Sequence, residues 1–174
     1  FNLDVKYAGE TVASKLARIR EEMKEAGTNV HVVSTIDDIC WTLNIRGNDI
    51  DFFPLVLSYG IITMDSFELY IDEKKLDDKL KAKLAKDGVN LHPYNDIYED
   101  VKKFGSDVVA MIDPGKLNYA LFNNIPENVK TVEKRNPAIL MKAIKNPIEI
   151  ENIRKAQIKD SVAHVRFMKW LKEN

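Results

Sequence analysis

The sequence lacks a second cysteine, a long apolar run and a surplus of charge of either sign, and each absence excludes a class of protein. Its single cysteine, Cys40, cannot form an internal disulfide and is typical of a reducing, cytoplasmic compartment. No apolar run approaches the ~20 residues that cross a bilayer, so we expect no membrane partner. The 26 basic and 27 acidic residues give a net charge of -1. A basic surface for nucleic acid is therefore not expected either.

Helical and extended patterns alternate along the chain. Apolar spacing of three and four residues predicts helices over residues 11–27, 35–44, 76–88, 95–105 and 136–145, and residues 113–124 are expected to form a turn and a short helix. Short β-branched or apolar runs predict strands over residues 29–34, 54–64, 67–72, 89–94, 107–112 and 129–134. The short link between the second and third of these runs predicts an antiparallel hairpin. This order predicts an α/β fold with a mixed, largely parallel β-sheet sandwiched by helices.

Residues 147–174 form a long predicted helix outside this alternation, so we divide the chain into a domain over residues 1–146 and this helix. Asn146 is the expected cap and Pro147 the first helical residue. A surface helix needs only one apolar face. We therefore expect the domain to cover one stripe and another domain to cover the second; the alternative is a helix packed centrally in its own domain. One stripe consists of Ile153, Ala156, Ala163, Phe167, Trp170 and Leu171, and the other of Ile158, Val162 and Val165.

The histidines and the cysteine do not form a recognisable metal or catalytic motif. His31, His92 and His164 are far apart in sequence, and no pair has the spacing of metal ligands on one helix. Cys40 lies in the middle of an apolar helix, a position typical of a small core residue rather than a reactive thiol. We therefore assign no catalytic residue and no metal ligand to this chain.

Asp37 and Asp38 are a candidate acid–base pair. Adjacent residues on a helix point about 100° apart, so we expect these carboxylates not to share a site. The first turn of a helix favours negative charge, which explains the pair without catalysis.

The segment "WTLNIRGNDIDFFPLVLSY" has the composition of a recognition site. Arg46, Asn48 and Asp49 surround a predicted turn at Gly47, and Tyr59 follows among aromatic residues. Polar groups that converge at a turn beside a sheet can bind a ligand or a neighbouring domain. In the alternative interpretation, Arg46 and Asp49 brace the turn through an ion pair and backbone hydrogen bonds. The two interpretations have equal support from the residues alone.

A family resemblance rests on several collinear motifs. "DDICWTLNIRGNDI", "SYGIIT", "HPY", "VVAMIDPGKLNYALFNNIP" and "KAIKNPIEIENIRKAQIKD" follow one another between about Ala8 and Lys172. Together they resemble the middle domain of three-domain aminopeptidase P, which is a creatinase N-terminal-like domain. Aminopeptidase P, also called Xaa-Pro aminopeptidase, belongs to the creatinase/prolidase group of the peptidase M24 family. One departure is Phe53, which stands before Pro54 where the family pattern has an asparagine.

The resemblance implies a ribonuclease-H-like fold and a role in a longer enzyme. That enzyme is a metallopeptidase, a hydrolase that removes the N-terminal residue before proline and uses two metal ions, usually manganese, held by a following domain. Residues 147–174 would lead into that catalytic domain, which we expect as the partner of the last helix, together with proline-containing peptide substrates and a homodimer. Two alternative hypotheses for the function of the chain are a stand-alone binding or scaffold module and a domain of a prolidase- or creatinase-type enzyme.

Overall fold

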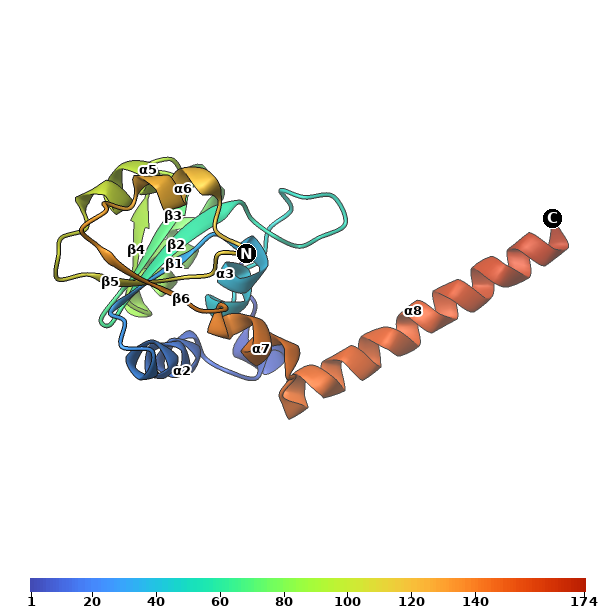
Figure 1. Ribbon diagram of the computed structural model, residues 1–174. Helices are drawn as coiled ribbons and strands as arrows, with labels where there is room; N and C mark the ends of the chain where they lie inside the picture. The colour runs from blue at the N-terminus through green and yellow to red at the C-terminus, as the bar shows by residue number, and fades with distance from the viewer.

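The computed structural model describes residues 1–174 and contains a six-stranded sheet in the order β4-β3-β2-β1-β5-β6 (Figure 1). The strands are β1 (Val30–Val33), β2 (Ser58–Thr63), β3 (Phe67–Ile71), β4 (Val89–His92), β5 (Val109–Ile112) and β6 (Lys130–Glu133). Strand β2 is antiparallel to both of its neighbours, β1 and β3. The pairs β3–β4, β1–β5 and β5–β6 are parallel. The predicted hairpin and the mixed, largely parallel sheet are therefore confirmed.

Helices cover both faces of the sheet. They are α1 (Val5–Ala8), α2 (Val12–Glu25), α3 (Ile36–Thr42), α4 (Asp78–Lys86), α5 (Ile97–Asp100), α6 (Tyr119–Asn124), α7 (Pro137–Ala143) and α8 (Pro147–Glu173), with 3₁₀ turns η1 (Glu73–Lys75) and η2 (Val101–Lys103). Side chains of α2, α3, α4 and α7 form a core on one face, and those of α5, η2 and α6 form a second core on the other. Burying one large aliphatic side chain in such a core stabilises the fold by ~1.5–3 kcal/mol. This arrangement confirms the predicted α/β class.

Two predicted elements differ from those observed. The strand expected from Pro54 begins only at Ser58, because the backbone before it pairs with the preceding turn: the N–H groups of Gly47 and Asp49 donate to the carbonyls of Pro54 and Leu55. The helix expected over residues 95–105 is one α-helical turn followed by η2, without a side-chain cap. The tighter 3₁₀ turn still keeps Ile97 and Val101 buried.

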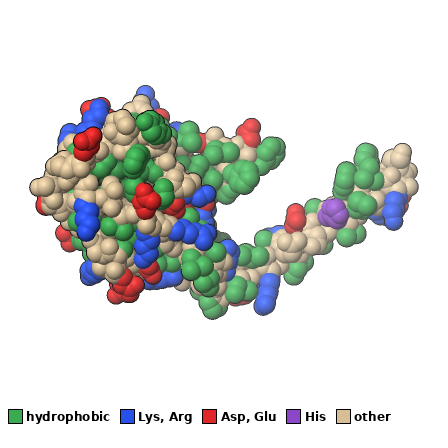
Figure 2. All heavy atoms as spheres, viewed as in Figure 1, with side chains coloured by type: hydrophobic (Ala, Val, Ile, Leu, Met, Phe, Trp, Pro, Cys, Tyr) green, Lys and Arg blue, Asp and Glu red, His purple; other side chains and the backbone are tan.

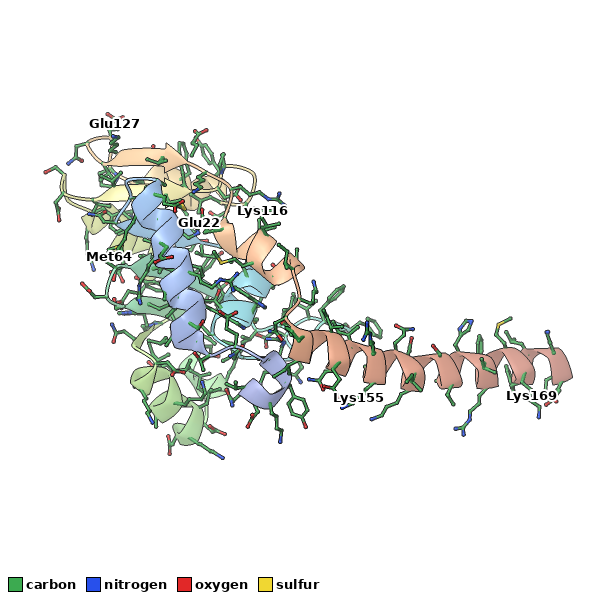
Figure 3. All side chains as sticks on the ribbon, turned by 90° about the horizontal axis from the view of Figure 1, so that it is seen from below. Glu22, Met64, Lys116, Glu127, Lys155 and Lys169 are labelled. Atoms are coloured by element: carbon green, nitrogen blue, oxygen red, sulfur yellow. The ribbon has the colours of Figure 1, made fainter.

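Helix α8 leaves the domain as an isolated rod (Figure 1). Its start matches the sequence pattern, since the Asn146 side chain accepts from the Glu149 N–H while the Glu149 carboxylate accepts from the Asn146 N–H. The Asn146 amide also donates to the Ala8 carbonyl at 2.8 Å, which fixes this end of the helix against α1. Beyond this attachment no residue of α8 is buried. Side chains such as Lys155 and Lys169 project away from the domain (Figure 3), and their only ion pairs are with glutamates of α8 itself.

The exposure of α8 corrects the expected packing of its two stripes. Ile153 and Phe167 of the first stripe are 50% and 53% exposed, and Ile158 and Val165 of the second are both 66% exposed. The domain therefore covers neither stripe, and the alternative of a centrally packed helix is wrong. No helix of the chain is both long enough and apolar enough to cross a membrane.

Candidate functional site

Three of the four candidate residues line one cavity. Arg46, Asn48 and Asp49 lie on the turn that follows α3, and the cavity beside them has a volume of about 410 Å³. Its lining also includes Phe1, Lys75 and apolar side chains of α4 and neighbouring segments. Residues 1–3 reach this place because they pair with residues 44–46 in extended conformation. The turn places one cation and one carboxylate at this cavity, and Lys75 of η1 adds a second cation.

Arg46 is held by the backbone rather than by an acidic side chain. Its guanidinium donates to the carbonyls of Cys40 at 2.9 Å and Ile45 at 2.8 Å. The Cys40 carbonyl lies in the last turn of α3, where a positive charge is favoured. Burial lowers the pKa of Arg46, although its ordinary value is high enough to keep the charge. Arg46 thus fixes the orientation of the turn against α3.

Asp49 is the residue that ties the turn to β2 and η1. Its Oδ2 accepts from the Leu57 N–H at 2.8 Å and from the Lys75 ammonium at 2.6 Å. Although burial acts in the opposite direction, these two donors hold the pKa of Asp49 below its ordinary value. The ion pair between Arg46 and Asp49 that we considered is not formed, because Lys75 takes the place of Arg46. Asn48 lies between them with its side chain exposed.

Tyr59 does not join this cavity. Side chains of a strand alternate between faces, and Tyr59 of β2 packs on the face covered by α5 and α6. Its hydroxyl lies 3.1 Å from that of Tyr98, and its ring centroid lies 5.1 Å from that of Tyr94. Burial is the main cause that raises the pKa of Tyr59; Tyr94 acts in the same direction, whereas the hydrogen bond with Tyr98 acts against it. The structure therefore separates Tyr59 from the three residues with which the sequence grouped it.

A buried polar network lies at the carboxyl ends of β1 and β5. The Asp38 side chain is 2% exposed and accepts from Lys142 at 2.6 Å, from the Asn136 amide at 2.9 Å and from the Thr35 hydroxyl at 2.5 Å. Lys142 also pairs with Asp37. The expectation that Asp37 and Asp38 do not share a site is wrong, because one lysine from α7 is long enough to bridge both carboxylates. Burial alone would lower the pKa of Lys142, but its hydrogen bonds to Asp37 and Asp38 outweigh this effect and raise the pKa.

His31 and Cys40 have structural positions. Both ring nitrogens of the fully buried His31 face oxygen atoms, Nδ1 at 3.1 Å from the Met111 carbonyl and Nε2 at 3.2 Å from Asn136 Oδ1. Burial lowers the pKa of His31. Burial also raises the pKa of the Cys40 thiol, and a protonated buried thiol is a weak nucleophile. Cys40 is thus a core residue, as its sequence position predicts.

Lys15 is an important residue that we did not predict. Its side chain is buried below α2, where the ammonium donates to the Trp41 carbonyl at 2.8 Å and to Asn44 Oδ1 at 2.7 Å. The ammonium also lies 4.3 Å from the centroid of the Trp41 ring. The signal was present in the sequence, because Lys15 lies three residues after Val12 and four before Ile19, on the apolar stripe of the helix.

No group of three or more histidine, cysteine, aspartate or glutamate side chains in the chain is placed to hold a metal ion. The adjacent carboxylates of Asp37 and Asp38 both pair with Lys142.

Comparisons with known proteins agree with this fold. The family profile "Creatinase/Prolidase N-terminal domain" matches residues 1–149. The chain is 40% identical over 176 residues to Xaa-Pro aminopeptidase 1 of Dictyostelium discoideum, covering 99% of the chain and 27% of that protein. It is 35% identical to a probable Xaa-Pro aminopeptidase P of Neurospora crassa, with the same coverage of 99% and 27%.

A solved structure is similar over the same length. The crystal structure of the X-prolyl aminopeptidase of Caenorhabditis elegans, described as a cytosolic enzyme with a di-nuclear active site, has a TM-score of 0.94 and 32% identity. The similarity covers 99% of this chain and 29% of that one. The chain thus spans less than a third of the length of these relatives.

Proposed function

The chain belongs to the creatinase/prolidase N-terminal domain family, and we propose that it is a non-catalytic domain of an Xaa-Pro aminopeptidase. The observation that carries the proposal is the match of nearly the whole chain to one part of curated Xaa-Pro aminopeptidases. In this role the domain shapes the substrate cleft and contacts other domains or subunits, and proline-containing peptides are the substrates of the longer protein. We place that protein in the cytoplasm, in line with the cytosolic C. elegans enzyme.

The exposed apolar stripes of α8 support a contact with another part of the same polypeptide. A helix that is apolar on two sides is stable in water only when both sides are covered. Residues 1–146 cover neither, so we assign both stripes to the catalytic part of the enzyme. Arg46, Asn48 and Asp49 are the candidates for the wall of the cleft or for a domain contact at the turn. Tyr59 would serve a contact on the opposite face of the sheet.

The metal ions of the enzyme do not fit this domain. The C. elegans relative is described as having a di-nuclear site, whereas the present chain offers no set of ligands for even one ion. We therefore assign two metal ions, manganese by resemblance, to the rest of the longer protein. No step of the reaction is assigned to a side chain of residues 1–174.

We expect the longer protein, and not this chain, to hydrolyse peptides. An assay with Xaa-Pro-Yaa and Xaa-Pro peptides, each with and without added manganese, compares the two proteins. Release of the N-terminal residue from Xaa-Pro-Yaa by the longer protein supports the proposal. Activity confined to Xaa-Pro dipeptides indicates a prolidase-type enzyme, and absence of both activities indicates a binding or scaffold module. Turnover by residues 1–174 alone contradicts the non-catalytic assignment.

The chain by itself is expected to self-associate through α8. Two copies can cover each other's exposed apolar residues, which include Ile158 and Val165. Sedimentation velocity over a hundredfold range of concentration should show a growing dimer fraction. Replacing Ile158 and Val165 together by lysine should weaken the association at least tenfold, whereas Lys159→Ala on the same helix should leave it unchanged. A monomer at every concentration would show that α8 has no tendency to pair.

A further inference from the structure

The loop between the turn and β2 exposes an aromatic side chain in an unfavourable backbone conformation. Phe52 is 102% exposed, and its φ of 67° lies in the left-handed region. That region is strained for a bulky residue, and a strained residue persists where the surrounding structure holds it. In water, an exposed phenylalanine also gains nothing from its apolar surface. The ring of Phe52 gains no packing from residues 1–174, because its side chain is fully exposed.

The loop is nevertheless held by hydrogen bonds at its tip and at its base. At the tip, the Phe53 N–H donates to the Ile50 carbonyl at 3.2 Å, and the Leu55 N–H donates to the Phe53 carbonyl at 2.7 Å. At the base, the Asp49 carboxylate receives the Leu57 N–H and the Lys75 ammonium, as described above. These hydrogen bonds restrain the backbone of the loop before it binds. Less conformational entropy is therefore lost when its aromatic side chains contact a partner.

The loop and α8 extend from the same side of the domain (Figure 1). Hydrophobic side chains gather on both (Figure 2). On the loop they include Phe52, Phe53 at 60% exposure and Leu57 at 41% exposure. Aromatic side chains at the centre of a contact commonly supply most of its binding energy. The loop is therefore suited to contact the same folded part that packs on α8.

We infer that Phe52 and Phe53 dock onto a folded part of the same polypeptide beyond residue 174, the part on which α8 also packs. This inference rests on the proposed function. The small size of the loop favours an occupant within the polypeptide, because two aromatic side chains present far less than the ~800 Å² that each partner of a stable two-protein complex buries. A part connected through α8 has a high effective concentration at the loop, so a small contact suffices.

Photo-crosslinking identifies the occupant directly. The longer polypeptide is prepared with p-benzoylphenylalanine in place of Phe52, and a matched control carries it in place of Tyr119, which is 78% exposed on α6. Mass spectrometry after irradiation should find position 52 joined to a peptide beyond residue 174 of the same molecule. Crosslinks between two copies, crosslinks only to an added proline-containing peptide, or a yield no higher than the control each overturn the inference.

Hydroxyl-radical footprinting supplies a second readout without substitution. The oxidation rate of the Phe52 side chain should be at least tenfold lower in the longer polypeptide than in residues 1–174, while the rate at Tyr119 stays the same. Equal rates at Phe52 overturn the inference. The peptidase assay is independent of both measurements. An active enzyme with an exposed Phe52 refutes only the docking, and an inactive protein with a protected Phe52 refutes only the proposed activity.

Discussion

Asp38→Ala is expected to lower the free energy of unfolding by about 3–5 kcal/mol, a range typical of breaking a buried ion pair. The carboxylate lies in the interior and is the shared acceptor of Lys142, Asn136 and Thr35. Its removal takes away the shared acceptor of the Asn136 amide and the Thr35 hydroxyl, and leaves between them only their own contact of 3.3 Å. Urea unfolding of residues 1–174 followed by circular dichroism measures the loss.

Asp37→Ala is the matched control for this prediction. Asp37 pairs with the same lysine, but its side chain is 51% exposed, and exposed ion pairs contribute only about 0–1 kcal/mol. The double variant Asp38→Ala, Lys142→Ala should lose less than the sum of the two single losses, because the partners are in direct contact. Equal effects of Asp37→Ala and Asp38→Ala would contradict the assignment of Asp38 as the buried centre of the network.

The free energy of unfolding is expected to rise with pH between about 8 and 10.5 through Lys15. Burial is the main cause that lowers the pKa of Lys15 from 10.5 to about 8. Between these values the unfolded state binds more protons than the folded state, so stability increases with pH. The size of the effect is roughly 3 kcal/mol. Below pH 8 Lys15 stays charged in the folded state, and the buried charge lowers the free energy of unfolding by its full amount. Above pH 8 Lys15 loses its proton in the folded state, so this unfavourable contribution decreases.

The measurement compares Lys15→Met with the unaltered chain in urea titrations from pH 7 to 10.5. As pH rises, the free energy of unfolding of the unaltered chain should increase relative to that of Lys15→Met. This comparison is needed because Cys40, whose pKa is raised by burial, acts in the opposite sense over the same pH range. Lys24→Met, on the exposed side of the same helix, should leave the pH dependence unchanged. A constant difference for Lys15→Met would show that the ammonium does not titrate in this range.

The candidate turn shows where sequence patterns stop being informative. The polar cluster of Arg46, Asn48 and Asp49 was predicted because the three residues are almost consecutive, and the structure brings them to one cavity. Whether that cavity binds a ligand or a domain stays a prediction. The partner of Asp49 was not predicted, because Lys75 lies 26 residues away. Tyr59 was grouped with the turn by proximity in sequence, but strand alternation directs it to the other face.

The sequence by itself determined the features that depend on neighbouring residues. Helix faces, caps and apolar strands are set by spacings of two to four residues, so α2, α4 and the capping box of α8 could be predicted with the fold class. Tertiary structure alone decided the contacts between distant residues. Asp38 and Lys142 are 104 residues apart, and Asp49 and Lys75 are 26 residues apart. Such contacts depend on how whole elements pack, because a side chain's partner is fixed by three-dimensional position and not by local spacing.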